Sequence, residues 1–299
     1  MTLQQLKYVV TVAECGNITE AAKQLFVSQP TVTSAIHDLE KEMQIVIFIR
    51  TNKGVILSED GERFLGHARQ VLEQVDLIEG IYKDDVVSKP HFAVSCQHYS
   101  FAVNAFVDVI RRFDAYQYDF TIREEQTHEI IEDVTNLKSE LGVIYLSSKN
   151  TEVLSKMLKR NELEFTELFT ATPHVFICDS HPLALKKSIT MDDLQDYPYL
   201  TYEQGEYNSQ YFSEEFVSTL DSRKNIRVRD RATLFNLIIG LNGYTVCSGV
   251  ISAELNGRNI ISKPLDVEEY MRIGIISRKG VVLSRYAREY IEALKAHCM

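Results

Sequence analysis

Residues 91–299 alternate between short apolar, β-prone runs and amphipathic helical runs. The runs HFAVSC (91–96), YDFTIRE (118–124) and LGVIY (141–145) are typical strands, and helical patterns cover 101–113 and 127–138 between them. A strand–helix–strand succession places helices against the faces of a parallel sheet. The pattern therefore predicts an α/β fold for about two thirds of the chain.

The alternation starts again after residue 163, which predicts two lobes. Its second round contains the β-prone runs LEFTELF, HVFIC, PYLTY, IRVRD and YTVCSG, and helical patterns near 209–220 and 232–242. The chain then closes with RIGIISR and a last helix, SRYAREYIEALK. We expect two crossovers near 163 and 267. The first lobe then takes 89–163 and 268–299, and the second lobe takes 164–267.

Residues 1–58 form a different, mostly helical segment. One apolar helical stripe ends at Gly16, a second short helix has Thr19 as a candidate N-cap, and a third begins at Ser28 with Pro30 in its first turn. Two β-prone runs follow, with Gly54 at the turn between them. We expect a compact domain of three helices and a two-stranded wing.

A long helix is predicted over 59–88, with Ser58 as its N-cap. Its apolar residues recur at intervals of four and three, and charged residues lie between them. Such a stripe favours pairing with the same helix of a second chain, although packing on its own domain is the alternative. The residues of this predicted dimerisation stripe are Phe64, Ala68, Val71, Val75, Ile78 and Tyr82.

Charge and cysteine content limit the classes of function. The 299 residues carry a formal net charge of −10, which argues against a surface coated with basic residues for non-specific nucleic-acid binding. The five cysteines are scattered and form no CxxC pair, which predicts neither a disulfide framework nor a metal site. No run approaches the ~18 apolar residues of a membrane span, and no signal sequence begins the chain. We therefore expect a cytoplasmic protein without a membrane partner.

The stretch ITEAAKQLFVSQPTVTSAIH (18–37) has the form of a helix-turn-helix. Small and apolar residues fall on its inner face, and short hydroxyl and amide side chains fall at the start of its second helix. Backbone N–H groups and hydroxyls at a helix N-terminus can bind phosphate, and Gln or Ser can reach base edges. The alternative is a small helical domain with a polar surface. The candidate DNA-binding residues are Ser28, Gln29, Pro30, Thr31, Thr33, Ser34 and His37, with Arg50 and Lys53 on the wing.

The order of these residues resembles the LysR-type transcriptional regulators. The matching positions are Ala21-Ala22, Leu25, Ser28-Gln29-Pro30, Thr33, Ile36 and Leu39-Glu40, followed by Phe48, Arg50, Val55, Leu57-Ser58 and Gly61. The resemblance implies a winged helix-turn-helix, a linker helix and two α/β lobes like a type 2 periplasmic binding protein. It also implies promoter DNA as a partner, assembly as a homodimer or homotetramer, and RNA polymerase as a further candidate partner.

One departure from the family pattern concerns charge. Family members often carry arginine on the exposed side of the recognition helix, where this chain has Ser34, His37 and Asp38. Fewer cations neutralise fewer phosphates, so we expect DNA binding with a shallow salt dependence. Modest affinity for each half-site would then be offset by binding several half-sites at once.

A small-molecule effector is expected in the cleft between the two lobes, because strand C-termini and helix N-termini meet there. The resemblance suggests a small anionic metabolite, with Ser100 and Thr127 as its contacts and Tyr202 on the opposing wall. These side chains could equally be ordinary helix caps. The candidate effector-binding residues are Cys96, Gln97, His98, Ser100, Gln126, Thr127, Thr201 and Tyr202.

Two other functions compete with that of a metabolite sensor. A redox-sensing regulator of the same family would need an accessible thiolate of low pKa, for which Cys96 is the candidate and Cys247 the partner. An α/β enzyme or a transport-type binding protein with a helical N-terminus is the other alternative. The chain has no GxSxG, HExxH, GxGxxG or Walker motif, and Cys96 and His98 lack a third catalytic partner. We therefore predict a regulator without catalysis, in which the effector favours one orientation of the lobes.

Overall fold

The computed structural model describes residues 1–52, 54–82, 90–113, 117–205, 211–215, 223–251 and 257–298. Lys53 and most of the helix expected near 209–220 lie outside these residues, and 211–215 form a turn and a bend. The chain divides into two compact units. The first is Met1–His91 with 117–119 and 136–138, and the second contains the remainder.

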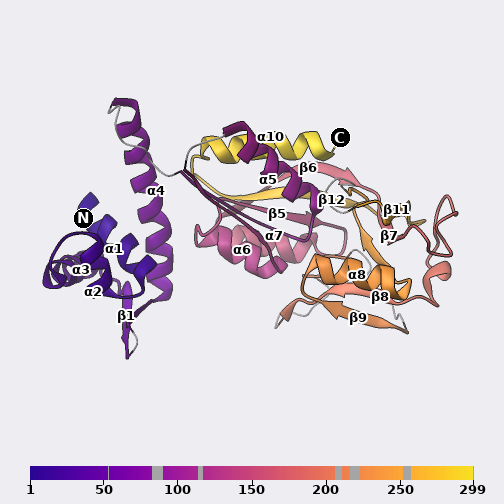
Figure 1. The fold of residues 1–299 in the computed structure, drawn as a ribbon, viewed down its shortest axis with the longest axis horizontal. Coiled ribbons are helices and arrows are strands. Elements are labelled where there is room, and N and C mark those ends of the chain that lie inside the picture. Colours follow the sequence, from indigo (N-terminus) through magenta and orange to yellow (C-terminus); the bar gives the residue numbers. More distant parts are fainter. Residues whose placement is uncertain are drawn as a thin grey trace. The chain divides into compact units, whose positions relative to one another are not determined.

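The N-terminal unit is a three-helix domain with a wing and a long fourth helix, α4 (Figure 1). Its apolar core draws on every helix of the unit and includes Val9, Ala21, Val32, Ile36 and Leu65. The elements are α1 (Leu3–Cys15), α2 (Ile18–Gln24), α3 (Gln29–Met43), β1 (Phe48–Thr51), β2 (Gly54–Leu57) and α4 (Glu59–Tyr82).

Helix caps set where these helices begin. Ser28 Oγ accepts a hydrogen bond from Thr31 N at 3.3 Å, and Ser58 Oγ accepts one from Gly61 N at 2.9 Å. Both N-cap predictions are confirmed. The prediction of Thr19 as the cap of α2 is wrong, because Asn17 Oδ1 accepts from Thr19 N at 2.8 Å and so places the cap two residues earlier.

Two contacts tie the wing to the helices. Glu40 Oε1, at the end of α3, accepts hydrogen bonds from Ile47 N at 2.7 Å and Phe48 N at 3.1 Å. Gly54 has φ +139° and lies so close to Gly16 that a Cβ would stand 2.3 Å from the Gly16 carbonyl oxygen. Only glycine fits this turn, so the expected glycine at the hairpin turn is confirmed and has a steric reason.

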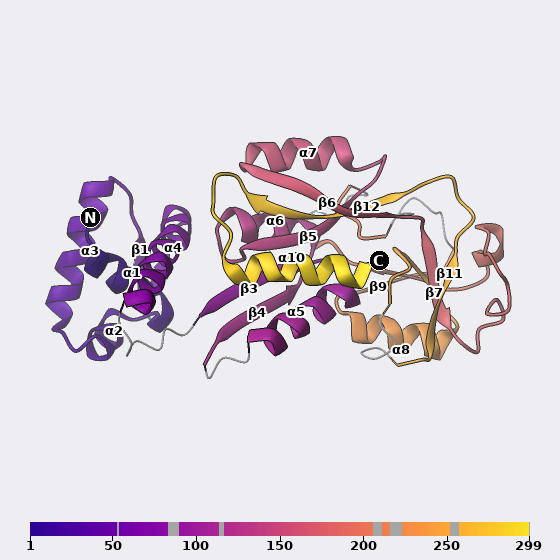
Figure 2. The same ribbon diagram turned by 90° about the horizontal axis from the view of Figure 1, so that it is seen from above.

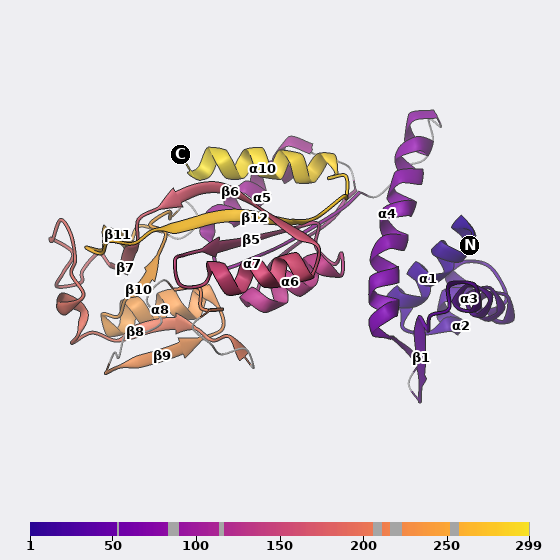
Figure 3. The same ribbon diagram turned by 180° about the vertical axis from the view of Figure 1, so that it is seen from behind.

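The first lobe of the second unit is a five-stranded sheet covered on both faces. Figures 1 and 3 show α5 and α10 on one face and α6 and α7 on the other. The strand order is β4-β3-β5-β12-β6. Its elements are β3 (His91–Cys96), α5 (Ser100–Phe113), β4 (Asp119–Glu124), α6 (Thr127–Thr135), β5 (Leu141–Leu146), α7 (Thr151–Arg160), β6 (Leu163–Ala171), β12 (Met271–Arg278) and α10 (Arg285–Cys298).

The second lobe holds a three-stranded sheet of order β10-β7-β11 and a separate parallel pair, β8 and β9. Helix α8 packs on this lobe, and its Leu234 and Ile238 join Phe176 and Leu200 in one apolar cluster. Figure 2 gives a second view of both lobes. The elements are β7 (His174–Cys178), a 3-10 turn (Asp192–Leu194), β8 (Tyr199–Tyr202), β9 (Asn225–Val228), α8 (Arg231–Leu241), β10 (Thr245–Cys247) and β11 (Ile260–Pro264).

The structure corrects two expectations about these sheets. β3 and β5 are parallel, but β12 runs antiparallel to both β5 and β6, and β7 is antiparallel to β10 and β11. The five-stranded sheet is therefore mixed and the three-stranded sheet is antiparallel, whereas the sequence pattern predicted parallel strands. Because β6 pairs with β12 in the first sheet, the chain crosses to the second lobe after Ala171 rather than near 163. The chain returns to the first sheet between Pro264, the end of β11, and Met271, the start of β12.

Candidate functional site

The start of α3 presents a polar surface to solvent. Ser28, Gln29, Thr31, Ser34 and His37 are all exposed. The neighbouring Pro30 is also exposed and fills the first turn of the helix, while Thr33 is half-buried. Backbone N–H groups at the start of a helix have no partner within the helix and carry partial positive charge. The arrangement can therefore accept a phosphate and present side chains to base edges.

The wing and the turn before α3 each carry one exposed residue of interest, Arg50 and Phe26. Arg50 is exposed on β1, and Lys53 lies outside the described residues. Sequence reasoning overlooked Phe26, which lies two residues before the Ser28 cap. Its side chain is 96% exposed, and its backbone adopts φ +55°, in the left-handed region. An exposed aromatic residue held in that conformation is uncommon, and the Leu-Phe-Val run gave no sign of it.

The apolar stripe of α4 divides into two parts. Ala68 is buried, and Phe64 packs against the core of the N-terminal unit. Val71 and Ile78 are 41% and 59% exposed, and Val75 is half-buried. The first part of the stripe is thus covered by its own domain, whereas the second part is open to another chain. The Tyr82 side chain lies outside what the structure describes.

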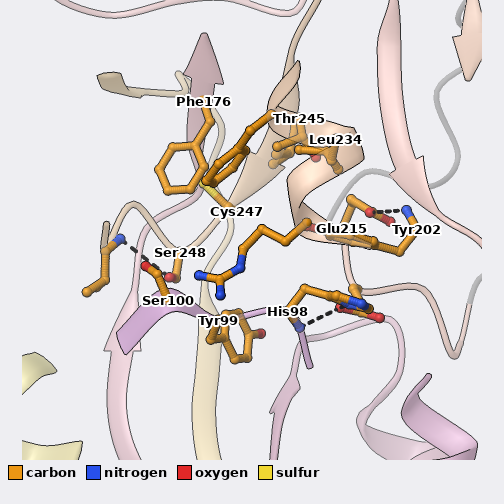
Figure 4. A pocket seen from close by; sticks show the side chains of 15 residues that line it. His98, Tyr99, Ser100, Phe176, Tyr202, Glu215, Leu234, Thr245, Cys247 and Ser248 are labelled. Atoms are coloured by element: carbon orange, nitrogen blue, oxygen red, sulfur yellow. Dashed lines mark hydrogen bonds and ion pairs between the residues drawn. The ribbon is translucent and has the colours of Figure 1, made fainter. Parts of the chain in front are cut away.

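A cavity of about 490 Å³, its open mouth included, lies between the two lobes of the second unit. Figure 4 shows Phe176, Thr245 and Leu234 toward one side and Tyr99 and His98 toward the other. The first group comes from the second lobe and the second group from the first lobe. The lining residues are His98, Tyr99, Ser100, Phe176, Tyr202, Glu214, Glu215, Arg231, Leu234, Phe235, Thr245, Val246, Cys247, Ser248 and Val250.

His98 and Glu214 form a buried ion pair in this cavity. His98 Nδ1 lies 2.8 Å from Glu214 Oε2, and the His98 backbone N–H donates to the same oxygen at 3.0 Å. The imidazole stacks on Tyr202 with ring centroids 3.8 Å apart. Burial lowers the pKa of His98, but the Glu214 carboxylate outweighs it, and the net pKa is raised. The pair holds the two lobes together through charge-assisted hydrogen bonds.

Glu215 occupies the same wall but behaves differently. Its Oε1 accepts from Tyr202 N at 2.6 Å, and its Oε2 lies 2.9 Å from Ser213 Oγ. Burial, reinforced by the neighbouring Glu214 charge, raises the pKa of Glu215 to about 8. At neutral pH this carboxyl group is therefore mostly protonated.

Two further polar groups complete the cavity. Arg231 begins α8 and pairs with Glu124, the shortest separation between Nη2 and Oε1 being 2.9 Å. Thr245 is 4% exposed, and its Oγ1 has no hydrogen-bond partner among the described residues. Thr245 and Phe176 face each other across β10 and β7, so their side chains lie on one face of the sheet. A second cleft of about 870 Å³ contains Glu124, Glu125, Gln126, His128, Glu129 and Arg229.

The predicted effector residues separate into three groups. His98, Ser100 and Tyr202 line the cavity, and Gln126 lines the second cleft. Gln97 and Thr127 are buried and line neither space, and they bond each other, with Gln97 Nε2 donating to Thr127 Oγ1 at 2.7 Å. Cys96 is fully buried in the apolar core, and Thr201 is half-buried on β8 without lining either space. Effector contact stays a prediction for the first group, whereas the structure turns Cys96, Gln97 and Thr127 away from the cavity.

The redox alternative does not agree with the surroundings of the two cysteines. Burial raises the pKa of the Cys96 thiol well above its ordinary value, as it does for Cys247, which lines the cavity as a free thiol. A peroxide-sensing cysteine needs the opposite, an accessible thiolate of lowered pKa. The expectation that the end of the YTVCSG strand approaches the cleft is correct.

Most of the second lobe's cavity residues escaped sequence reasoning. Phe176, Leu234 and Phe235 look like ordinary core positions in the sequence, and Thr245 lies inside a strand. Asp230 was the usable signal, because it is an N-cap that accepts from Thr233 N at 2.8 Å and so makes Arg231, a lining residue of the cavity, the first residue of α8. Within the described residues, no cluster of three or more His, Cys, Asp or Glu side chains is placed to hold a metal ion.

A winged helix-turn-helix followed by two α/β lobes around a ligand cavity defines a DNA-binding regulator that responds to a small molecule. Residues 3–62 match the bacterial regulatory helix-turn-helix proteins of the LysR family, and residues 95–299 match the LysR substrate-binding domain. The chain belongs to the LysR family of transcriptional regulators. This confirms the predicted fold class, and it confirms promoter DNA and an effector as partners.

Similar proteins include two curated regulators and one solved structure. CysB of Burkholderia cenocepacia is 30% identical over 210 residues, which is 68% of this chain and 63% of CysB. OxyR of Escherichia coli K12 is 22% identical over 302 residues, covering 99% of this chain and 95% of OxyR. The structure of a full-length OxyR point variant from Pseudomonas aeruginosa has a TM-score of 0.65 at 22% identity and covers 99% of this chain and 98% of its own. That structure supports the fold.

In the part of the chain that the structure describes, no helix combines the length and apolarity needed to cross a membrane.

Proposed function

We propose that this regulator reads promoter DNA through the start of α3. The observation that supports the proposal most directly is the exposed, Ser28-capped helix start, where Gln29, Thr31 and Ser34 all face solvent. Gln29 is the longest of these side chains and can form a bidentate contact with adenine in the major groove. Ser28, Thr31 and the N–H groups of the first turn bind the adjacent phosphate.

The exposed part of α4 brings two copies together. Regulators of this family form oligomers, and a two-fold axis through Val71 and Ile78 would match two half-sites of a palindromic operator. A dimer of such dimers is the larger assembly we propose. The chain acts by binding rather than by catalysis, and it acts in the cytoplasm, where promoter DNA and RNA polymerase are found.

The effector binds in the cavity between the lobes. It contacts both lobes, so it favours the lobe orientation in which those contacts are made and shifts the population toward that orientation. The paired winged helices then change their spacing on the promoter. The observation behind this step is the lining itself, which draws His98 and Ser100 from one lobe and Leu234 and Thr245 from the other.

Footprinting of the purified protein on DNA from its own upstream region tests the proposal. The parent protein should protect specific segments, and Gln29→Ala should lower specific affinity at least about fivefold at fixed salt, the loss expected of one good base contact. Circular dichroism should show an unchanged fold. Gln44→Ala, at the exposed far end of α3, is the matched control and should bind like the parent. Equal affinity of the Gln29 variant and the parent would contradict this placement of Gln29.

A further inference from the structure

The cavity contains ionisable groups that the protein itself already pairs. Among the described lining residues these groups are His98, Glu214, Glu215 and Arg231. His98 pairs with Glu214 at 2.8 Å, and Arg231 pairs with Glu124 at 2.9 Å. Glu215 is held by Tyr202 N and Ser213 Oγ. A charged ligand would have to displace one of these partners.

The position suited to an anion is occupied by a side chain. Helix α5 begins at Ser100, and the backbone N–H groups at and before a helix start attract negative charge. Here the backbone N–H of His98 donates to Glu214 Oε2, and the His98 imidazole pairs with the same oxygen through Nδ1. Gln204 Nε2 donates to the other oxygen of Glu214 at 3.2 Å. An incoming carboxylate would meet Glu214 at this position and be repelled.

Binding of a cationic ligand in this cavity is also unfavourable. Glu214 already accepts three hydrogen bonds, and a buried carboxylate with that many donors gains little from another. Arg231 lies in the same lining and would repel an ammonium group. Burial and the like charge of Glu214 also oppose ionisation of Glu215, so Glu215 does not attract a cation either.

Among the fully buried side-chain oxygen and nitrogen atoms of the described cavity lining, one lacks a hydrogen-bond partner. Thr245 Oγ1 is buried and makes no hydrogen bond, although buried polar groups are almost always satisfied. Its cross-strand neighbour is Phe176, and Leu234 and Phe235 also line the cavity, so the hydroxyl lies in an apolar wall. A ligand atom that bonds this hydroxyl, with an apolar group beside it, would satisfy both features.

We propose that this cavity, taken as the effector site of the proposed function, selects a neutral amphiphilic molecule. Its amide, carbonyl or hydroxyl group bonds Thr245 Oγ1, and a branched aliphatic or aromatic tail packs on Phe176 and Leu234. This class differs from the small anion that the family resemblance suggests. The difference arises because Glu214 fills the anion position in this chain.

Three probes with the same branched tail test the charge of the ligand: 3-methylbutanamide, 3-methylbutanoate and 3-methylbutylamine. Ligand-observed NMR titration of the full chain at neutral pH measures the weak binding of such small molecules. The amide should bind at least about fivefold more tightly than either ion, the effect of about one hydrogen bond's worth of free energy. Tighter or equal binding of the carboxylate or the amine, or no binding of any probe, would overturn the proposal.

Thr245→Val and Thr245→Ser locate the contact. Valine has the shape of threonine without the hydroxyl, so it should weaken amide binding about fivefold while leaving the melting temperature equal or higher, because an unpaired buried hydroxyl is removed. Serine should retain the binding. Thr166→Val, an exposed threonine on β6, is the matched control. Unchanged amide binding in Thr245→Val would refute the contact.

DNA footprinting of the same variants separates this inference from the proposed function. Thr245→Val should protect upstream DNA like the parent, because Thr245 belongs to the ligand-binding unit. If DNA is protected but the ranking of the probes is wrong, the ligand class is wrong and the regulator stands. If no preparation protects DNA, the proposed function itself fails.

Discussion

At the scale of single residues, two adjacent carboxyl groups have different partners. Glu214 pairs with His98, and both side chains are 4% exposed. Glu215 faces a backbone N–H and the Ser213 hydroxyl instead of a basic side chain. Burial, reinforced by the neighbouring Glu214, raises the pKa of Glu215 to about 8.

The raised pKa of Glu215 makes stability depend on pH in a definite direction. In the unfolded chain this carboxyl has an ordinary pKa of about 4.3. Between that value and about 8 the folded state holds a proton that the unfolded state lacks. The free energy of unfolding therefore falls as pH rises through this window, by at most about 1.4 kcal/mol per pH unit for one proton.

Glu215→Gln, which mimics the protonated carboxyl, should remove this contribution. Urea unfolding at pH 6 and pH 8 measures it, and the loss of stability between the two should be smaller in the variant than in the parent. Glu152→Gln is the control, because Glu152 is exposed on α7 and bonds Lys156, which lowers its pKa. If the variant and the parent lose the same amount, the buried proton is not on Glu215.

At the scale of elements, local signals were sufficient for most helices and strands. Ser28 and Ser58 predict where their helices begin. A serine before an apolar stripe can act as an N-cap, because its hydroxyl oxygen accepts a hydrogen bond from the backbone N–H three residues later. Local sequence signals did not show whether paired strands run parallel or antiparallel. β12 joins β5 and β6 from a hundred or more residues away in the sequence, so its antiparallel direction depends on tertiary packing. The helix α7 and the strand β11 were not predicted at all.

The candidate site shows the same division. His98, Ser100 and Tyr202 were predictable because they lie at or just after the end of a strand or at the start of a helix. Thr127 satisfied the same rule, yet its hydroxyl donates to Phe212 O at 2.8 Å and is buried. Thr245 could be assigned to the cavity wall only from the pairing of β10 with β7, which is not evident in the sequence. Sequence indicates the edge of a cavity more readily than the wall opposite.

Helix α4 supports a prediction about assembly. Val71→Glu should break the dimer, because it places a charge in the exposed apolar part of the stripe, where burial of an unpaired carboxylate is costly. Light scattering at micromolar concentration should show the mass of a smaller species. Gln70→Glu adds the same charge at the neighbouring position, off the stripe, and should leave the assembly intact. A native mass for the Val71 variant would refute pairing through this part of α4.

At the scale of the whole molecule, charge is distributed unevenly. Residues 1–58 contain five basic and five acidic residues, so the full net charge of −10 lies in residues 59–299. The DNA-reading segment is therefore neutral within an acidic protein. DNA binding then depends on helix N-termini and hydrogen bonds more than on the neutralisation of phosphates. Because non-specific affinity for DNA is mostly electrostatic, the affinity for non-target sequences should be low.

Adding one cation to α3 should change this balance measurably. Ser34 is exposed on α3, so Ser34→Arg should raise operator affinity and make log K fall more steeply with log salt. Two recognition helices in a dimer would gain two phosphate contacts, which steepens the slope by about 2. Ser34→Gln, which is long but neutral, controls for side-chain size and should leave the slope as in the parent. Titrations across a range of salt concentrations measure both quantities. An arginine variant with the parent's slope would mean that Ser34 does not approach the DNA backbone and that α3 docks through another face.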